Sequence, residues 1–186
     1  MFYLGLDIST SCTGWSLIGP DGLLEDMGYI RLDTNKTLFQ KALRVKECLL
    51  DINKAYKINN IYIEQNLQAF RSGFSSAKTI DKLAKFNGII SYISFDVFSI
   101  EPDFINVNSA RRCLGIKIIR KKDGGDPVKN QILEWVSGEI SQYKWPEKIL
   151  KSGPRKGVAV LENGCFDMAD AYVIARAGQV LNNTHL

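Results

Sequence analysis

The amino-acid sequence predicts an α/β fold: a mixed five-stranded sheet, made of an antiparallel three-strand meander plus parallel strands, with helices on both faces. Three observations support this prediction. Residues 2–32 hold three runs of strand-forming residues joined by short links. The next segment repeats apolar residues with the spacing of one helix face. After it, short apolar runs alternate with helical patterns, which is the order of elements in a sheet covered by helices.

The meander is predicted from the first three runs, Phe2–Ser9, Gly14–Ile18 and Leu23–Leu32. The second and third runs are separated by Pro20-Asp21-Gly22, in which proline presets φ and glycine accepts a positive φ. Such short links are typical of connections between neighbouring antiparallel strands.

A helix and a buried strand follow. One helix face is marked by Leu38, Ala42, Val45, Leu49 and Ile52. Asn59-Asn60 is predicted to turn the chain into the short apolar strand Ile61-Tyr62-Ile63, and Glu64 stands at the end of that strand.

The second half begins with a helix capped by Ser75 or Ser76, and we expect its inner face to carry Ile80, Leu83 and Ala84. The fifth strand is predicted at residues 104–107. A short helix capped by Asn108 or Ser109 should follow and run through Leu114.

Asp126-Pro127 is a strong helix start, with a capping side chain and then proline at the first helical position. Val128, Ile132 and Val136 mark the inner face of that helix. Residues 143–157 are rich in proline, glycine and lysine and are predicted to form a long loop. The last helix should run from about Cys165 to Leu181.

Composition limits the kind of protein. We expect one domain over residues 1–186, because 186 residues with 45% hydrophobic content can bury a sizeable core. The apolar stretch at residues 88–98 is interrupted and too short to cross a membrane. No signal-peptide pattern opens the chain, so we expect a cytoplasmic protein. The four cysteines lack metal-site spacing and are expected to be reduced.

The charge is unevenly distributed. Residues 111–156 hold twelve Lys or Arg against five Asp or Glu, whereas the rest of the chain holds twelve against fifteen. A basic segment beside an acidic site suits a polyanion that must reach metal-bound carboxylates. A solvated basic face would give the same count.

Four acids are candidate metal ligands. Asp7 and Glu64 each interrupt an apolar strand, where an unpartnered carboxylate is costly. Asp167 and Asp170 are three apart at a helix start and therefore share one face. Simpler explanations exist: Asp167 could favour the helix dipole, Glu64 could be a hydrogen-bonded core acid, and Asp7 could belong to a phosphate-binding loop.

If the four acids meet, they need cations. Two unit charges about 4 Å apart repel by roughly 4 kcal/mol at an effective dielectric of about 20. Oxygen-only ligands favour hard ions, Mg²⁺ or Mn²⁺. Two such ions roughly 3.5–4 Å apart can serve the attacking water and the leaving oxygen of a phosphodiester. The single histidine, His185, lies at the chain end and is a poor candidate base.

The motifs resemble those of RuvC-type Holliday junction resolvases over nearly the whole chain. They are Leu-Gly-Leu-Asp at residues 4–7, Thr-Gly-Trp at 13–15, Ile-Glu-Gln at 63–65 and Asp-Met-Ala-Asp-Ala at 167–171. The resemblance implies a ribonuclease-H-like fold, a homodimer, and paired nicks in a four-way junction made with two Mg²⁺ ions per active site, for which Mn²⁺ can substitute. It also implies that Asp7, Glu64, Asp167 and Asp170 are the metal ligands.

The resemblance also implies DNA contacts. Lys129, near the start of its helix, is expected to contact a phosphate near the cut and to act in catalysis. An aromatic residue after Glu64 is expected to wedge into the junction; Phe70 is favoured over Phe74, and Arg71 lies between them. Further contacts are expected from basic residues of the second half: Arg111, Arg112, Lys117, Arg120, Lys121 and Lys122.

The sequence departs from the family pattern in three places. Ile8-Ser9 replaces the usual Pro-Gly, residues 117–126 are longer and more basic than the usual turn, and residues 143–163 look extended. These differences leave four-way-junction specificity and any cleavage sequence open, and they would suit a phage or mobile-element member.

Three alternatives compete with a DNA resolvase. An actin-like or sugar-kinase-like phosphotransferase opens similarly but needs two such cores and a glycine-rich turn, and residues 8–13 contain no glycine. We therefore expect no nucleotide cofactor. An RNA-processing nuclease on the same fold would use the same carboxylates. A non-catalytic binder of branched DNA would gain nothing from acids placed near phosphates.

Overall fold

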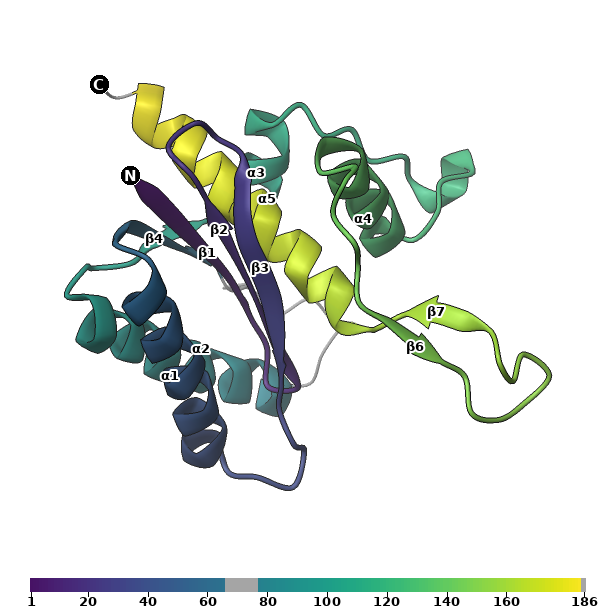
Figure 1. The fold of residues 1–186 in the computed structure, drawn as a ribbon, viewed down its shortest axis with the longest axis horizontal. Helices are drawn as coiled ribbons and strands as arrows, with labels where there is room; N and C mark the ends of the chain where they lie inside the picture. The colour runs from purple at the N-terminus through teal and green to yellow at the C-terminus, as the bar shows by residue number, and fades with distance from the viewer. Residues whose placement is uncertain (66–76, 185–186) are drawn as a thin grey trace.

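The fold is built on a five-stranded sheet, seen in a computed structural model that describes residues 1–65 and 77–184. The strands lie in the order β3-β2-β1-β4-β5 (Figure 1). Their bounds are β1 Phe2–Ile8, β2 Cys12–Ile18, β3 Leu24–Arg31, β4 Ile58–Glu64 and β5 Asp103–Ile105. β1, β2 and β3 pair antiparallel, whereas β4 pairs parallel with β1 and with β5. The predicted mixed sheet is confirmed.

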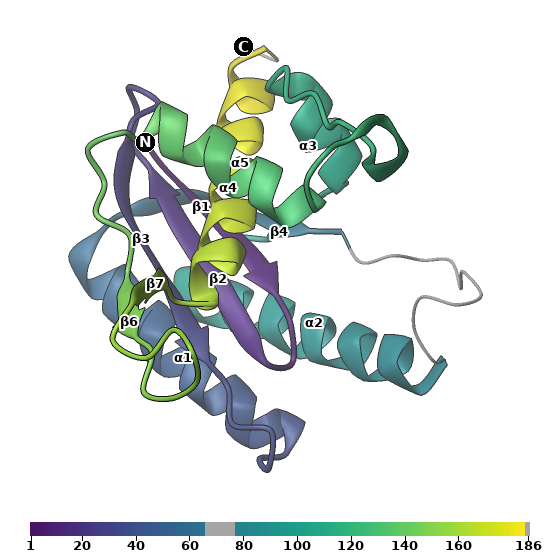
Figure 2. The same ribbon diagram turned by 90° about the vertical axis from the view of Figure 1, so that its right-hand side faces the viewer.

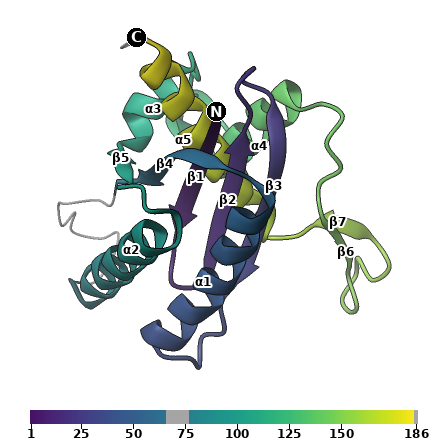
Figure 3. The same ribbon diagram turned by 60° about the vertical axis from the view of Figure 1, so that its left-hand side comes forward.

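Helices cover both faces of the sheet (Figures 1 and 3). One face carries α1 (Leu38–Ala55) and α2 (Ala77–Phe98); the other carries α5 (Gly164–Thr184), flanked by α3 (Val107–Cys113) and α4 (Val128–Glu139). Successive strand residues point to opposite faces. In β1, Leu4, Leu6 and Ile8 therefore join the core under α1 and α2, and Tyr3 joins the core under α5.

α1 is confirmed with the predicted inner face. Thr37 caps the helix by accepting a hydrogen bond from the Gln40 backbone, and the Gln40 side chain accepts one from the Thr37 backbone. Val45 and Leu49 are fully buried against the sheet. Lys41 is buried too, and its Nζ donates a 2.6 Å hydrogen bond to the Thr10 carbonyl in the β1–β2 turn.

The backbone of α5 lies directly against two glycines of the sheet. A Cβ on Gly5 would lie 2.4 Å from the Ala171 carbonyl oxygen, and a Cβ on Gly14 would lie 2.0 Å from the Asp167 carbonyl oxygen. No side chain fits at either position, so β1 and β2 carry glycine where the helix crosses them. This approach fixes the first turns of α5 against the middle of the sheet.

Some local predictions were wrong. β4 begins at Ile58, so Asn59-Asn60 lies within the strand and not in a turn. α3 is capped by Asn106, whose side chain accepts from the backbones of Asn108 and Ser109, and not by either of those residues. Asp126 makes no capping hydrogen bond in α4, where Pro127 occupies the cap position.

α2 also turns a different face to the core from the one predicted. Its buried residues are Phe86, Asn87, Ile90 and Ser94, whereas Ile80 and Leu83 are half-buried and Ala84 is exposed. The proposed caps Ser75 and Ser76 lie outside the described residues.

The predicted long loop before α5 is a β-hairpin. β6 (Glu147–Ile149) and β7 (Ala159–Leu161) pair antiparallel as a separate two-stranded sheet. Figures 1 and 3 show the hairpin extending from the body near the start of α5.

No helix in residues 1–65 or 77–184 combines the length and apolar character that a membrane span requires.

Candidate active site

Asp7 and Glu64 lie side by side at the ends of two parallel strands. Leu6 of β1 pairs with Ile63 of β4, so the next residue on each strand is one of these acids. Neighbouring strands lie about 4.8 Å apart. Both acids point to the α5 side of the sheet, because Leu6 and Ile63 are in the core under α1 and α2.

Asp167 and Asp170 approach the same place from α5. Gly14 is the residue of β2 that pairs with Asp7, and the backbone of Asp167 passes directly over it. Asp170 lies about one turn further along the helix and shares the face of Asp167. We call Asp7, Glu64, Asp167 and Asp170 the carboxylate cluster.

The ionisation of Asp7 reports how close the acids are. Burial raises the pKa of Asp7 well above its usual range, and the charges of Glu64, Asp170 and Asp167 raise it further. The charge of Lys129 acts in the opposite direction. All three other acids therefore lie near enough for their charges to act on Asp7.

Glu64 and Asp170 respond in the same way. Burial, followed by the charge of Asp170, raises the pKa of Glu64 to about 7, although Arg111 and Lys129 oppose the rise. Burial also raises the pKa of Asp170, again against Arg111 and Lys129. The ion-free site therefore holds more protons at neutral pH than isolated carboxylates would.

Two basic residues complete the site. Arg111 on α3 places Nη2 3.8 Å from Oδ1 of Asp170, and both side chains are less than one-fifth exposed. Its Nε is buried and has no hydrogen-bond partner among the described residues. Lys129 lies exposed in the first turn of α4. The sequence indicated Arg111 only as a DNA contact, and no local pattern reveals its pairing with Asp170.

Cys12 is a further neighbour that the sequence did not indicate. Burial, followed by the charge of Asp167 and a hydrogen bond with it, raises the pKa of the Cys12 thiol. The thiol stays protonated, so it is not a nucleophile in this environment. It is a neutral polar neighbour of Asp167.

The donor set of the carboxylate cluster suits a hard cation, because it offers only carboxylate oxygens. As they stand, residues 1–65 and 77–184 contain no group of three or more His, Cys, Asp or Glu side chains able to hold a metal ion. The fit therefore rests on donor chemistry and on the mutual repulsion seen in the pKa of Asp7, which bound divalent cations would relieve.

The other predicted DNA contacts are spread more widely. Arg112 is exposed on α3. Four more are exposed in the connection between α3 and α4, which contains a short 3₁₀ turn at Lys121–Asp123: Lys117, Arg120, Lys121 and Lys122. Phe70, Arg71 and Phe74 lie outside the described residues.

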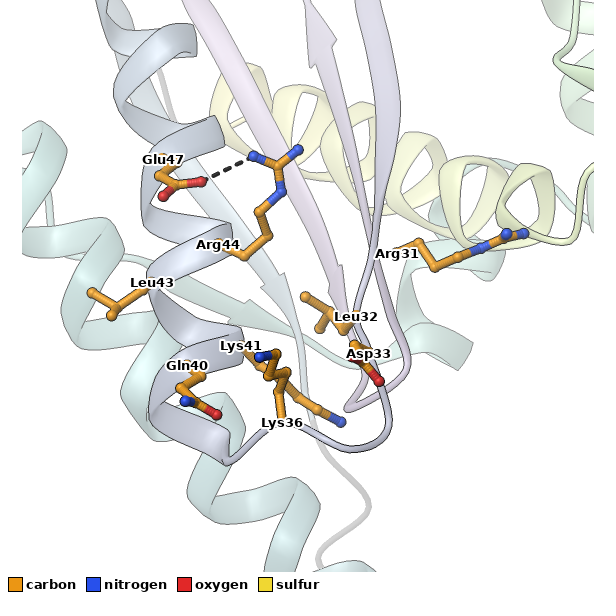
Figure 4. Close-up of a pocket in the computed structure, with 9 residues that line it drawn as sticks. All are labelled: Arg31, Leu32, Asp33, Lys36, Gln40, Lys41, Leu43, Arg44 and Glu47. Carbon is orange, nitrogen blue, oxygen red and sulfur yellow. Dashed lines mark hydrogen bonds and ion pairs between the residues drawn. The ribbon is translucent and has the colours of Figure 1, made fainter.

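A separate basic cavity of about 470 Å³ lies between the end of β3 and α1 (Figure 4). Its lining includes Arg31, Lys36, Lys41 and Arg44. Arg44 is paired with Glu47 at 2.9 Å, and the Nζ of Lys41 is already bonded to the Thr10 carbonyl. α1 lies across the sheet from α5, so this cavity is not part of the carboxylate cluster.

Comparison with solved structures agrees with the fold predicted from the motifs. The Thermus thermophilus RuvC structure in complex with Holliday junction substrate aligns over 99% of this chain and 96% of that one, at a TM-score of 0.67 and 14% identity. A second Thermus thermophilus RuvC structure gives 0.64 and 15%, over 100% of this chain and 97% of that one.

The yeast mitochondrial Holliday junction resolvase Ydc2 aligns over 98% of this chain and 81% of that one, at a TM-score of 0.54 and 14% identity. No protein-family model and no curated protein sequence matches the chain. The chain has the ribonuclease-H-like fold of RuvC-type resolvases.

Proposed function

We propose that this chain is a metal-dependent endonuclease that resolves Holliday junctions and related branched DNA by paired nicks. The observation that carries the proposal is the carboxylate cluster, in which three acidic charges act on Asp7 while Arg111 and Lys129 lie close enough to oppose them. Gathering negative charge where phosphates must bind is useful only if cations join the site.

The fold supports the same proposal. The three solved structures described above are resolvases, and one of them is bound to a Holliday junction. Alignment over 99% of the chain means that the resemblance includes the strand ends and the α5 start that carry the acids.

We assign roles as follows. The carboxylate cluster would hold two Mg²⁺ ions, or Mn²⁺ in their place, which supply activation of the attacking water and stabilisation of the leaving oxygen. Lys129 would bind a phosphate oxygen near the cut. Arg111 would hold Asp170 in place. Its remaining N–H groups would donate to phosphates of the DNA strand that Lys129 contacts.

Two nicks require two sites, so we propose a symmetric homodimer. The outer surface of α1 and α2 offers an apolar face for a second copy, because several large side chains there are between 39% and 72% exposed: Phe39, Leu43, Leu50, Tyr92 and Phe95. An ion pair of 2.7 Å between Lys46 of α1 and Asp96 of α2 links the two helices, so their outer sides form one continuous face.

The test is a substrate panel. Four-way, three-way, flap and linear duplex DNA, together with a structured RNA, are incubated with the protein in Mg²⁺, Mn²⁺ or EDTA, and the cuts are mapped. We expect symmetric nicks in the four-way junction, none in EDTA, and little cutting of linear duplex. Preferred cutting of the RNA would replace this proposal with the RNA-processing alternative, and binding without any cutting would leave a branched-DNA binder.

A further inference from the structure

The β6–β7 hairpin, residues 147–161, carries a concentrated positive charge. It contains four basic residues, Lys148, Lys151, Arg155 and Lys156, and one acid, Glu147. Lys151, Arg155 and Lys156 are exposed, and none of the three forms an ion pair with a described residue. Within residues 1–65 and 77–184 these three cations are not neutralised by an acid, so their charge can attract an anionic partner.

The tip of the hairpin is held by backbone hydrogen bonds. Leu150 and Val158 extend the pairing beyond the strands at 3.0 Å, and Gly157 donates back to Leu150 at 2.9 Å. Lys156 donates to Gly153 at 3.1 Å, with Gly153 and Gly157 at positive φ as the turn requires. The tip therefore presents its charges from an organised turn.

The base of the hairpin is tied to the helix that carries half of the carboxylate cluster. Glu162 follows β7, and its carboxylate accepts a 2.6 Å hydrogen bond from the Tyr29 hydroxyl of β3. The Tyr29 ring lies against Gly164, the first residue of α5, where a Cβ would approach within 2.3 Å of it. The Glu162 backbone also donates to Pro146 at 2.9 Å, which closes the hairpin.

This anchoring sets where the tip can reach. An extended chain rises about 3.3 Å per residue, so the six steps from Glu147 to Gly153, of which only the first two lie in β6, span at most about 20 Å, or about six base pairs of duplex. Figure 2 shows the hairpin and the α3–α4 connection on opposite sides of α5. A duplex entering the site between them would be contacted from both sides.

We propose that the hairpin is a DNA-binding arm, which holds the phosphate backbone of the duplex flanking the cut through Lys151, Arg155 and Lys156. The inference rests on the proposed function and adds a contact surface to it. Phosphate binding is favoured over a protein partner because the tip carries three exposed cations, whereas two of the three exposed apolar residues of the hairpin, Ile149 and Leu161, lie on the strands and only Val158 lies beyond them.

The experiment measures four-way-junction affinity in EDTA, where no cutting interferes, at salt concentrations from 50 to 300 mM. The test variant is Arg155→Gln/Lys156→Gln. The control variant, Lys54→Gln/Lys57→Gln, removes the same charge near the start of β4, at the opposite end of that strand from Glu64. A second test variant replaces residues 150–158 with Asn-Gly, a turn suited to a two-residue hairpin.

We expect the test variants to lower affinity roughly ten- to fifty-fold at about 0.1 M salt, and Arg155→Gln/Lys156→Gln to reduce the log–log salt slope by about two. The control variant should change affinity less than twofold. The two double substitutions should keep the melting temperature of the wild type, because the replaced side chains are exposed; the variant that replaces residues 150–158 also loses the half-buried Leu150, so its melting temperature is measured before its affinity is compared.

The outcomes separate the two proposals. If the wild type binds and cuts junctions but the test variants keep the wild-type salt slope of binding, the DNA-binding arm is refuted and the nuclease proposal stands. If the wild type binds junctions without cutting any branched DNA in Mg²⁺, the nuclease proposal is refuted. The salt slope of the test variants then decides by itself whether the hairpin is a DNA-binding arm. A wild type that binds no DNA refutes both. A change in sedimentation of Arg155→Gln/Lys156→Gln would refute the arm in favour of a contact between copies.

Discussion

Asp7 is surrounded by acids at the end of β1, and the charges of Glu64, Asp170 and Asp167 each raise its pKa. Asp7 lies on the face of β1 that α5 covers, where Tyr3 of the same strand is part of the apolar core. Burial and the three neighbouring negative charges disfavour its ionised form, although the charge of Lys129 opposes this effect. We therefore expect that the role of Asp7 is to bind cations, and that substitution of Asp7 affects cation binding and not folding.

We predict that Asp7→Asn abolishes cutting while junction binding survives. The amide removes one negative charge and one metal ligand, but it leaves the basic surface unchanged. Cleavage in Mg²⁺ should fall by at least a hundredfold, and junction affinity in EDTA should change less than threefold. Full cleavage by this variant would refute the ligand assignment. The matched control Asp21→Asn alters an exposed acid in the β2–β3 turn and should cut normally.

A second prediction concerns Glu64 and pH. Its pKa is about 7 in the folded protein and about 4.5 when unfolded, so the folded state binds more protons between these values. Stability without metal should therefore fall as pH rises from 5 to 8, by roughly 1–3 kcal/mol, and then level off. Thermal unfolding in EDTA measures this.

Glu64→Gln is the matching variant, because it cannot lose a proton. Its melting temperature should depend less on pH than that of the wild type, with the remaining dependence due to Asp7 and Asp170. Mg²⁺ added at pH 8 should stabilise the wild type more than the variant. Identical pH profiles for the two proteins would contradict the role given to Glu64.

At the scale of elements, the position of α5 decides whether a site exists. The helix lies against Gly5 and Gly14, and its first turns carry Asp167 and Asp170. Its apolar side chains, including Met168 and Ile174, are buried. Packing and chemistry thus depend on the same close approach, and any side chain at the crossing points would disturb both.

We predict that Gly14→Ala destabilises the protein by 2 kcal/mol or more, on the order of the cost of overpacking a core. The new Cβ would meet the Asp167 carbonyl, so helix and sheet must separate and cutting should be lost. Chemical denaturation measures the first effect and a cleavage assay the second.

Gly88→Ala is the control, because a Cβ at this exposed position in α2 meets nothing within 4 Å. It should stabilise the protein by about 0.5–1 kcal/mol through helix propensity. If Gly14→Ala were as stable as Gly88→Ala, the close contact would not be a constraint on the site.

The sequence predicted the elements whose patterns are local. The α1 stripe of Ala42, Val45 and Leu49 was visible because one face of an amphipathic helix repeats regularly. The buried face of α2 was missed because it includes the polar residues Asn87 and Ser94. The β6–β7 hairpin was missed because three-residue strands in mostly exposed, basic sequence have no apolar alternation to mark them.

The same limit applies to the site. Asp7 and Glu64 were singled out as candidates because acids that interrupt apolar strands stand out from their surroundings. The contact of Arg111 with Asp170 depends on α3 packing against α5, and residues far apart in sequence leave no local sign of such a contact. Cys12 was likewise assigned only as a reduced thiol, since its approach to Asp167 follows from the tertiary fold.

For the whole molecule, the proposed function requires two sites that act on one substrate. The chain supplies one carboxylate cluster, so paired nicks need a second copy. The apolar surface of α1 and α2 lies across the sheet from α5, which would leave both clusters free to contact DNA (Figure 3). The arrangement therefore favours a dimer formed through the helical layer.

We predict that the protein sediments as a dimer at micromolar concentration and that Tyr92→Lys weakens this association at least tenfold. The charge would have to be buried at the contact. Leu23→Lys is the control, since Leu23 is 66% exposed against 68% for Tyr92 but lies in the β2–β3 turn. A monomeric wild type, with and without DNA, would remove the homodimer from the proposal.

The alternation of β1 has a consequence for how such a protein can change over time. Leu4, Leu6 and Ile8 face the layer made by α1 and α2, whereas Gly5 and Asp7 face α5. Substitutions among Leu4, Leu6 and Ile8 should therefore change stability with the least direct effect on the carboxylates. A side chain at Gly5 would disturb both the packing of α5 and the carboxylates that it carries, although the two faces belong to the same seven-residue strand.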